Sequence, residues 1–161
     1  MKIIFLDFDG VMNKNDTSDR VPHPFMKGRR VVGLEADIVK RVSALAVSAG
    51  AKVVISSTWR MFYKLDDLRA LLLSYGWLPE AEIIGETPKD PPHRGPGLII
   101  HGYDRGDEIQ AWLTEHGTPE HFLVLDDLPT QFKDNHIQTN DSEGFTPQQV
   151  ERAMQILGGM A

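Results

Sequence analysis

Acidic side chains stand directly after two of the apolar runs in this sequence. Asp7 and Asp9 follow an apolar run at the start of the chain, and Asp126 and Asp127 follow the run Phe122–Leu125. Carboxylate oxygens suit a hard divalent cation such as Mg²⁺, which usually keeps water and substrate phosphate in its coordination shell. Without a cation, grouped carboxylates repel one another and their pKa values rise. The acids therefore indicate a magnesium site, provided that the fold brings them together.

A third apolar run, Lys52–Ile55, ends in hydroxyl groups and a guanidinium rather than in acids. The residues that follow it are Ser56, Ser57, Thr58, Trp59 and Arg60. Hydroxyl groups and the N–H groups of a helix start can bind phosphate oxygens. Arg60 has two open interpretations, which are binding of a substrate phosphate and pairing with a nearby acid. Trp59 could stack on a nucleic-acid base, but its type favours a core or hinge position because tryptophan is highly buried on average.

The elements that must position these residues alternate along the chain. We expect helices over residues 34–49, 65–75, 104–117 and 146–157, and strands at Lys2–Leu6, Lys52–Ile55, Glu82–Ile84, Phe122–Leu125 and His136–Gln138. This alternation predicts a three-layer α/β/α, Rossmann-like fold with a mostly parallel central sheet. Ligands bind beyond the carboxyl ends of such strands. One aspartate after a strand is commonly a turn or capping residue, so the agreement of three strand ends is the stronger signal.

Length, charge and composition limit the classes of protein that fit. The 161 residues show no repeat or linker, so we expect one domain over residues 1–161. The net charge of −6 argues against coating nucleic acid by bulk charge, although it allows a local basic groove. The absence of cysteine excludes disulfides, thiolate zinc sites and cysteine nucleophiles. The apolar start is too short for a signal peptide or a membrane span, so we expect a cytoplasmic protein with no membrane partner.

Four segments, in order, resemble the motifs of one enzyme superfamily. They are Asp7–Val11, Ser56 after Val53–Ile55, Arg105 at a helix start, and Val124–Asp127 with its paired aspartates. These are similar to the four motifs of the haloacid dehalogenase (HAD) superfamily of phosphohydrolases, and the match runs from residue 2 to about 140. Three further segments resemble a subgroup, the HAD domain associated with RNA-repair proteins of phages and bacteria. Those segments are Ser56–Arg60, Arg105–Ile109 and Gly144–Thr146.

The resemblance implies roles for the acids. Asp7 would be the nucleophile that forms an aspartyl-phosphate, with its second oxygen on Mg²⁺. Asp9 would protonate the leaving oxygen and then activate water, and its backbone carbonyl would contact the metal. Asp126 is expected to ligate the metal directly, and Asp127 through water or as an orienting group, although the two could be exchanged. Gly10 would allow the tight turn beside the site.

The resemblance also implies the groups that bind the phosphate. Ser56 is expected to donate to a phosphate oxygen, with Ser57 as the alternative, and backbone N–H groups near Thr58 would complete the anion site. Arg105 is expected to pair with the phosphate as the basic third motif. Lys89 and Arg94 are alternatives for that role, because both lie in a long loop at residues 87–103.

Short cap segments point to an open site. Many HAD relatives carry a large cap domain, whereas here residues 13–33 have room only for a flap or minimal cap. Between Lys14 and Arg30 the flap holds five basic residues against two acidic ones. That excess either steers a phosphorylated polymer toward the site or belongs to a solvated surface.

The leading hypothesis is therefore a Mg²⁺-dependent phosphohydrolase that acts on a nucleotide or polynucleotide phosphate end. Alternative substrates are a small phosphomonoester and a phosphoprotein. Alternatives of another class are a phospho-acceptor signalling domain and a non-catalytic binding module. Phospho-acceptor domains carry the acidic pair on the first strand and the acceptor aspartate on a central one. Here Asp7 and Asp9 follow the first strand, which favours the hydrolase.

Overall fold

The computed structural model describes residues 1–23, 26–89 and 104–160. Its centre is a five-stranded sheet in the order β5-β4-β1-β6-β7, in which every neighbouring pair is parallel. The strands are β1 Lys2–Leu6, β4 Ala51–Ile55, β5 Ile83–Glu86, β6 His121–Asp126 and β7 His136–Gln138. Each predicted strand is present within a residue or two. The expected α/β fold with a parallel central sheet is confirmed.

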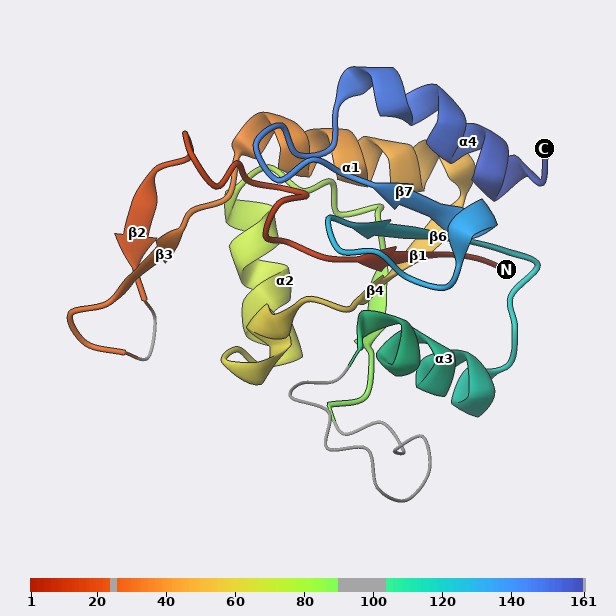
Figure 1. Cartoon of the computed structure of the whole chain (residues 1–161), viewed down its shortest axis with the longest axis horizontal. Helices are drawn as coiled ribbons and strands as arrows, with labels where there is room; N and C mark the ends of the chain where they lie inside the picture. The colour runs from red at the N-terminus through yellow and green to blue at the C-terminus, as the bar shows by residue number, and fades with distance from the viewer. Residues whose placement is uncertain (24–25, 90–103, 161) are drawn as a thin grey trace.

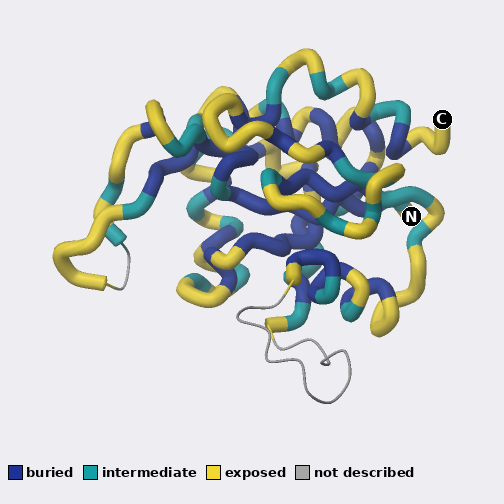
Figure 2. Tube along the Cα trace, viewed as in Figure 1, coloured by how far each residue is buried: buried dark blue, intermediate teal, exposed yellow. Residues whose placement is uncertain are grey.

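Helices cover both faces of the sheet. The helices are α1 Ala36–Ala49, α2 Leu65–Ser74, α3 Arg105–His116 and α4 Val150–Gly158. In Figure 1, α1 and α4 lie above the strands and α3 lies below them. Alternate side chains of β1 point to opposite faces of the sheet. Ile4 and Leu6 pack in one apolar cluster with α1, α2 and α4, whereas Ile3 and Phe5 pack in another with α3. The strands are thus buried on both sides (Figure 2).

Local signals fix the ends of the helices. The Asp104 side chain accepts a hydrogen bond from the Gly106 N–H at 3.0 Å, so α3 begins at the predicted cap and Arg105 is its first residue. Helix α1 ends at Gly50, whose φ of +64° is in the left-handed region. The last predicted helix starts with a 3-10 turn, η3 Pro147–Gln149, before α4 begins.

The flap contains structure that the sequence did not predict. Strands β2 Arg20–Pro22 and β3 Arg30–Val32 form an antiparallel pair that is separate from the central sheet. Figure 1 shows this hairpin projecting from the body. Three-residue strands are too short for an alternating pattern to reveal them. Two further 3-10 turns, η1 Thr58–Met61 and η2 Lys133–Asn135, follow β4 and precede β7.

Two other predictions concern the long loop and the absence of a membrane span. Most of the predicted long loop, residues 90–103, lies outside the described residues. Among the helices that are described, none combines the length and apolar character needed to cross a membrane.

Candidate active site

Three neighbouring strands end at the same level of the sheet. Leu6 of β1 is in register with Ile55 of β4 and with Leu125 of β6. The pairing continues one step further, since the Asp7 N–H donates to the Leu125 carbonyl at 3.0 Å and the Ser56 N–H donates to the Leu6 carbonyl at 2.9 Å. The parallel sheet therefore brings Asp7, Ser56 and Asp126 to one rim, which is the meeting point that the sequence predicted.

Asp7, Asp126 and Asp127 form a compact acidic cluster at this rim. Each offers one carboxylate oxygen, and these oxygens all lie within 4.8 Å of one another. Asp7 is 3% exposed and Asp126 is fully buried. Burial raises the pKa of Asp7 well above its usual value, and it raises the pKa of Asp126 to about 6 and that of Asp127 as well. The cluster is therefore costly to ionise without a compensating cation.

The chemistry of the cluster fits a divalent cation. All of its donors are carboxylate oxygens, the ligand type that Mg²⁺ prefers. Within the described chain, Oδ2 of Asp126 is buried and accepts no hydrogen bond, although Arg105 approaches it as an ion-pair partner. Asp9 was predicted to contact the metal through its backbone carbonyl, and its side chain contributes no oxygen to this cluster.

Arg105 lies beside the acids. From the first turn of α3, its Nε is 2.9 Å from Asp126 Oδ2 and its Nη2 is 3.5 Å from Asp7 Oδ1. Burial lowers the pKa of Arg105, but Asp7 and Asp126 more than compensate, so the net shift is upward and the cation persists. Of the three basic candidates, Lys89 is exposed and lies 3.4 Å from Glu86, and Arg94 is outside the described residues.

Arg60, one of the residues predicted to bind substrate, is engaged by protein partners instead. Its side chain is 0% exposed, and all three guanidinium nitrogens have protein partners. These partners are the carbonyls of Ser56, Ser57, Thr87 and Pro88 and the carboxylate of Glu108, which is 2.6 Å from Nη2. Arg60 thus ties the ends of β4 and β5 to α3, which is the acid-pairing interpretation. Its partner Glu108, also 3.8 Å from Arg105, was not singled out from the sequence.

The two serines after β4 have different surroundings. The Ser57 hydroxyl caps η1 by accepting from the Trp59 N–H at 3.2 Å. The Ser56 hydroxyl is buried and has no hydrogen-bond partner among the described residues. An unsatisfied buried polar group costs about 1–3 kcal/mol, so this hydroxyl is the one available to a ligand. Thr58, the first residue of η1, is exposed at the same rim.

Asp9 is held by two donors on opposite sides. The Trp59 indole N–H donates to its Oδ2 at 2.9 Å, and the Asn13 amide donates to its Oδ1 at 2.9 Å. Asn13 also donates to the Val32 carbonyl of β3 at 3.3 Å and accepts from the Gly10 N–H at 2.8 Å. Asn13 thereby connects Asp9 to the flap. The sequence did not single it out, because no motif marks a buried asparagine.

Trp59 and Gly10 shape the same turn. Trp59 is 7% exposed, with its ring packed against Phe8 at 5.5 Å and stacked on Tyr63 at 5.7 Å. This is the core position that its residue type favoured, not a free stacking platform. Gly10 has φ of +74°, and a Cβ there would lie 2.6 Å from Asp127 Oδ2. Glycine is therefore required both by the turn and by the close approach to the acidic cluster.

Comparison with known families agrees with this geometry. Residues 3–150 match the family described as "HAD domain in Swiss Army Knife RNA repair proteins". The chain belongs to this family. Neither a curated protein nor a solved structure matches it. Membership makes the protein a HAD-type domain of the phosphohydrolase class, and the acidic cluster at the ends of β1 and β6 is its candidate metal site.

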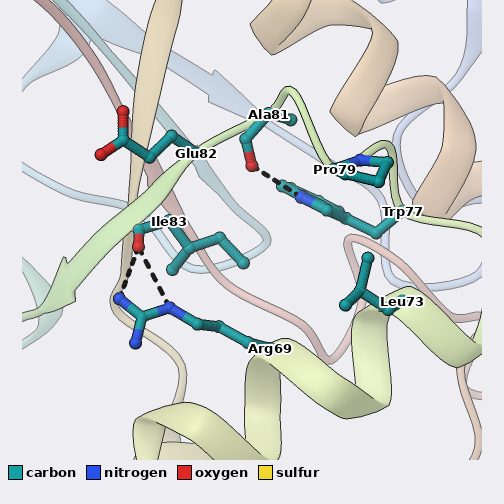
Figure 3. A pocket seen from close by; sticks show the side chains of 7 residues that line it. All are labelled: Arg69, Leu73, Trp77, Pro79, Ala81, Glu82 and Ile83. Atoms are coloured by element: carbon teal, nitrogen blue, oxygen red, sulfur yellow. Dashed lines mark hydrogen bonds between the residues drawn. The ribbon is translucent and has the colours of Figure 1, made fainter.

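Among the pockets lined by described residues, one lies away from the acidic cluster and another adjoins the rim. A pocket of about 360 Å³ lies between α2 and β5. Figure 3 shows two of its side chains directed at nearby backbone, with Arg69 donating to the Ile83 carbonyl and Trp77 to the Ala81 carbonyl. No residue of the acidic cluster lines it. A smaller pocket, of about 90 Å³, has Asp9 in its wall and therefore adjoins the candidate active site.

Proposed function

We propose that this HAD domain is a Mg²⁺-dependent phosphohydrolase that uses Asp7 as nucleophile and acts on the phosphate end of a nucleotide or polynucleotide. The observation that carries the proposal is the position of Asp7, which lies close to the carboxylates of Asp126 and Asp127 and within 3.5 Å of the guanidinium of Arg105. An acid in these surroundings can be kept ionised by a cation while it attacks phosphorus.

The reaction has two displacements at phosphorus. In the first, a carboxylate oxygen of Asp7 attacks phosphorus, the bond to the leaving oxygen breaks, and Asp9 gives that oxygen a proton. In the second, water attacks the aspartyl-phosphate and gives a proton to Asp9. The bond between phosphorus and the Asp7 oxygen then breaks, which releases inorganic phosphate and restores both acids.

The remaining residues neutralise and orient the phosphate. Arg105 pairs with the phosphate oxygens while it offsets the charge of Asp7, and the free Ser56 hydroxyl donates to a third oxygen. Positioning and charge neutralisation supply most of the catalysis in phosphoryl transfer. Mg²⁺, held by Asp7, Asp126 and Asp127, would supply a Lewis acid that draws charge from the transferring phosphoryl group.

The choice of a nucleotide or polynucleotide end rests on charge and on the family. Arg20, Lys27, Arg29 and Arg30 of the flap are all exposed. A basic surface next to a catalytic rim attracts a polyanion. The RNA-repair proteins named in the family description act on such polymers, and this supports the same class of substrate here.

A substrate panel tests the proposed function. The purified protein should release phosphate from 3′- or 5′-phosphorylated oligonucleotides in Mg²⁺, and EDTA should abolish the release. Mononucleotides, sugar phosphates and a phosphopeptide complete the panel. Faster release from sugar phosphates or the phosphopeptide than from every nucleotide substrate would refute the proposed substrate class. Release that persists in EDTA would refute the role of the metal.

A further inference from the structure

We propose that the small pocket beside Asp9 is a nucleoside subsite, which receives the sugar that carries the scissile phosphate and presents the ring of Phe62 to its base. This inference rests on the proposed function and deepens it, because it assigns a binding site to the leaving group. The pocket encloses about 90 Å³ and is lined by Asp9, His23, Thr58, Trp59, Phe62 and Tyr63, together with Val31.

The pocket lies on the side of Asp9, where the leaving group is expected. In an in-line displacement the nucleophile and the leaving oxygen lie on opposite sides of phosphorus. Asp9 is the acid that protonates the leaving oxygen, so the group attached to that oxygen must lie next to Asp9. The pocket has Asp9 in its own wall, whereas Asp7 is not part of its lining. It is therefore placed for the leaving group.

The walls of the pocket are built before any ligand arrives. Trp59 is fixed by stacking on Tyr63, with the two ring planes 13° apart, and by its indole hydrogen bond to Asp9. Elsewhere in the lining, the rings of His23 from the flap and Phe62 make a T-shaped contact, with their centroids 5.2 Å apart. The flap and η1 are thus joined at the pocket by aromatic contact.

The lining favours a nucleoside over other leaving groups. Its volume of about 90 Å³ is more than a single water needs. This is room for one small ring rather than a whole nucleotide. Thr58 is exposed and offers a hydroxyl group to the sugar. Phe62 is 44% exposed, so its ring is accessible to a base outside the pocket. The basic flap strand next to His23 suits the rest of a polynucleotide.

The test compares substrates that differ only in the terminal base. One set of oligonucleotides ends in a phosphorylated nucleotide, and the matched set ends in a phosphorylated abasic sugar, each in 3′- and 5′-phosphate forms. The measured ratio is kcat/KM on the oligonucleotides with a terminal base divided by kcat/KM on the abasic ones. We expect Phe62→Ala to lower this ratio about tenfold for at least one of the two ends. A tenfold loss is within the range measured when one base–aromatic stack is removed.

Control variants separate stacking from a general effect. Met61→Ala removes a neighbouring side chain of similar exposure, 45%, that is not in the pocket lining, and it should leave the ratio unchanged. Phe62→Tyr should keep the ratio, because it keeps an aromatic face. Phe62→Leu should lower the ratio, and it replaces the alanine variant if circular dichroism shows that alanine disturbs the fold.

Each outcome bears on a different claim. If the wild-type protein hydrolyses the oligonucleotides and Phe62→Ala and Phe62→Leu leave the ratio unchanged, the subsite is refuted while the proposed function stands. An equal loss on both sets also refutes the subsite, since it would assign Phe62 to the sugar or the fold. If the wild-type protein hydrolyses neither set in Mg²⁺, both the proposed function and the subsite are refuted.

Discussion

At the scale of single residues, the site depends on where each charge and donor is directed. Asp7 and Arg105 form a buried ion pair at the rim, and the Ser56 hydroxyl has no described partner. Asp9 is different, because both of its oxygens accept hydrogen bonds, one from Trp59 and one from Asn13. These two donors set the direction of the acid that must reach the leaving oxygen.

The indole of Trp59 should be a positioning group for Asp9. Trp59→Phe keeps a ring between Phe8 and Tyr63 but removes the N–H that donates to Asp9. General acid–base catalysis contributes about 10²–10⁴-fold to a rate, so misdirecting Asp9 should lower kcat on an aryl phosphate roughly tenfold or more. The fall should exceed any change in KM, and the pH profile of kcat should move.

Trp77→Phe is the matched control for this change. Trp77→Phe also removes a buried indole hydrogen bond, which Trp77 donates to the Ala81 carbonyl. Trp77 lines the pocket between α2 and β5, away from the acidic cluster. It should lower stability without changing the pH profile. If Trp59→Phe and Trp77→Phe have the same kinetic effect, the indole of Trp59 does not position Asp9.

The acidic cluster makes stability depend on pH and on metal. The pKa of Asp126 is raised by burial to about 6 from its usual 3.8, so the folded chain binds that proton more tightly than the unfolded chain does. This contribution to stability is complete below about pH 3.8 and is lost as the pH rises to about 6. Above that range the metal-free protein carries the full cost of its buried carboxylates.

Mg²⁺ should therefore stabilise the protein more at pH 7.5 than at pH 5. A ligand at about 100 times its Kd adds about 2.7 kcal/mol to the free energy of unfolding. For a chain of this size that corresponds to a rise in Tm of roughly 5–10 °C. Thermal denaturation at both pH values measures the difference. An equal rise at both pH values, or an undiminished rise in Asp126→Asn, would contradict the assignment of the cluster as the metal site.

At the scale of elements, the rim is made by strand order and stabilised by the buried ion pair between Arg60 and Glu108. Strands β4, β1 and β6 are adjacent, so their last residues need no long loops to meet. Arg60 then binds the backbone after β4 to the backbone after β5, and Glu108 links both to α3. The flap is attached at the same rim through the hydrogen bond that Asn13 donates to Asp9.

Arg60 should matter for stability more than any surface pair. Removing one partner of a buried ion pair leaves the other charge unpaired, which costs about 3–5 kcal/mol. Arg60→Ala should lower the free energy of unfolding by about that amount in a urea titration. Lys52→Ala breaks the exposed pair with Glu82 and should cost less than about 1 kcal/mol. Equal costs for the two variants would show that the Arg60 network does not hold the rim.

The flap should act on polymers through its charge. Reversal of Arg29 and Arg30 to glutamate should lower kcat/KM on a phosphorylated oligonucleotide several-fold more than on an aryl phosphate. The difference should shrink as salt is added, because phosphate contacts release counterions. Arg152→Glu reverses an exposed charge on α4 and should affect both substrates alike. Equal effects of the flap reversal on the two substrates would count against steering by the flap.

At the scale of the whole molecule, hydrophobic periodicity and strand order are the features that could be predicted from the sequence. Asp7, Ser56 and Asp126 could be placed at one rim because each stands just after an apolar run. Long-range partners could not be predicted in this way. Arg60 reaches Glu108 of α3, and Trp59 reaches Asp9, through side-chain packing that has no local signature. The β2–β3 hairpin was missed because its strands are too short to show an alternating pattern.

The central claim is that Asp7 is the nucleophile of a metal-assisted phosphohydrolase. The most direct measurement is the rate of phosphate release from a phosphorylated oligonucleotide in Mg²⁺ by the wild-type protein and by Asp7→Asn, with the Tm of each as the control for folding. We expect the wild-type protein to release phosphate from the oligonucleotide over many catalytic cycles. Asp7→Asn should lose at least about a thousandfold in kcat and remain folded, because it removes a costly buried charge. A folded Asp7→Asn protein that hydrolyses the oligonucleotide at a rate near that of the wild type would contradict the account.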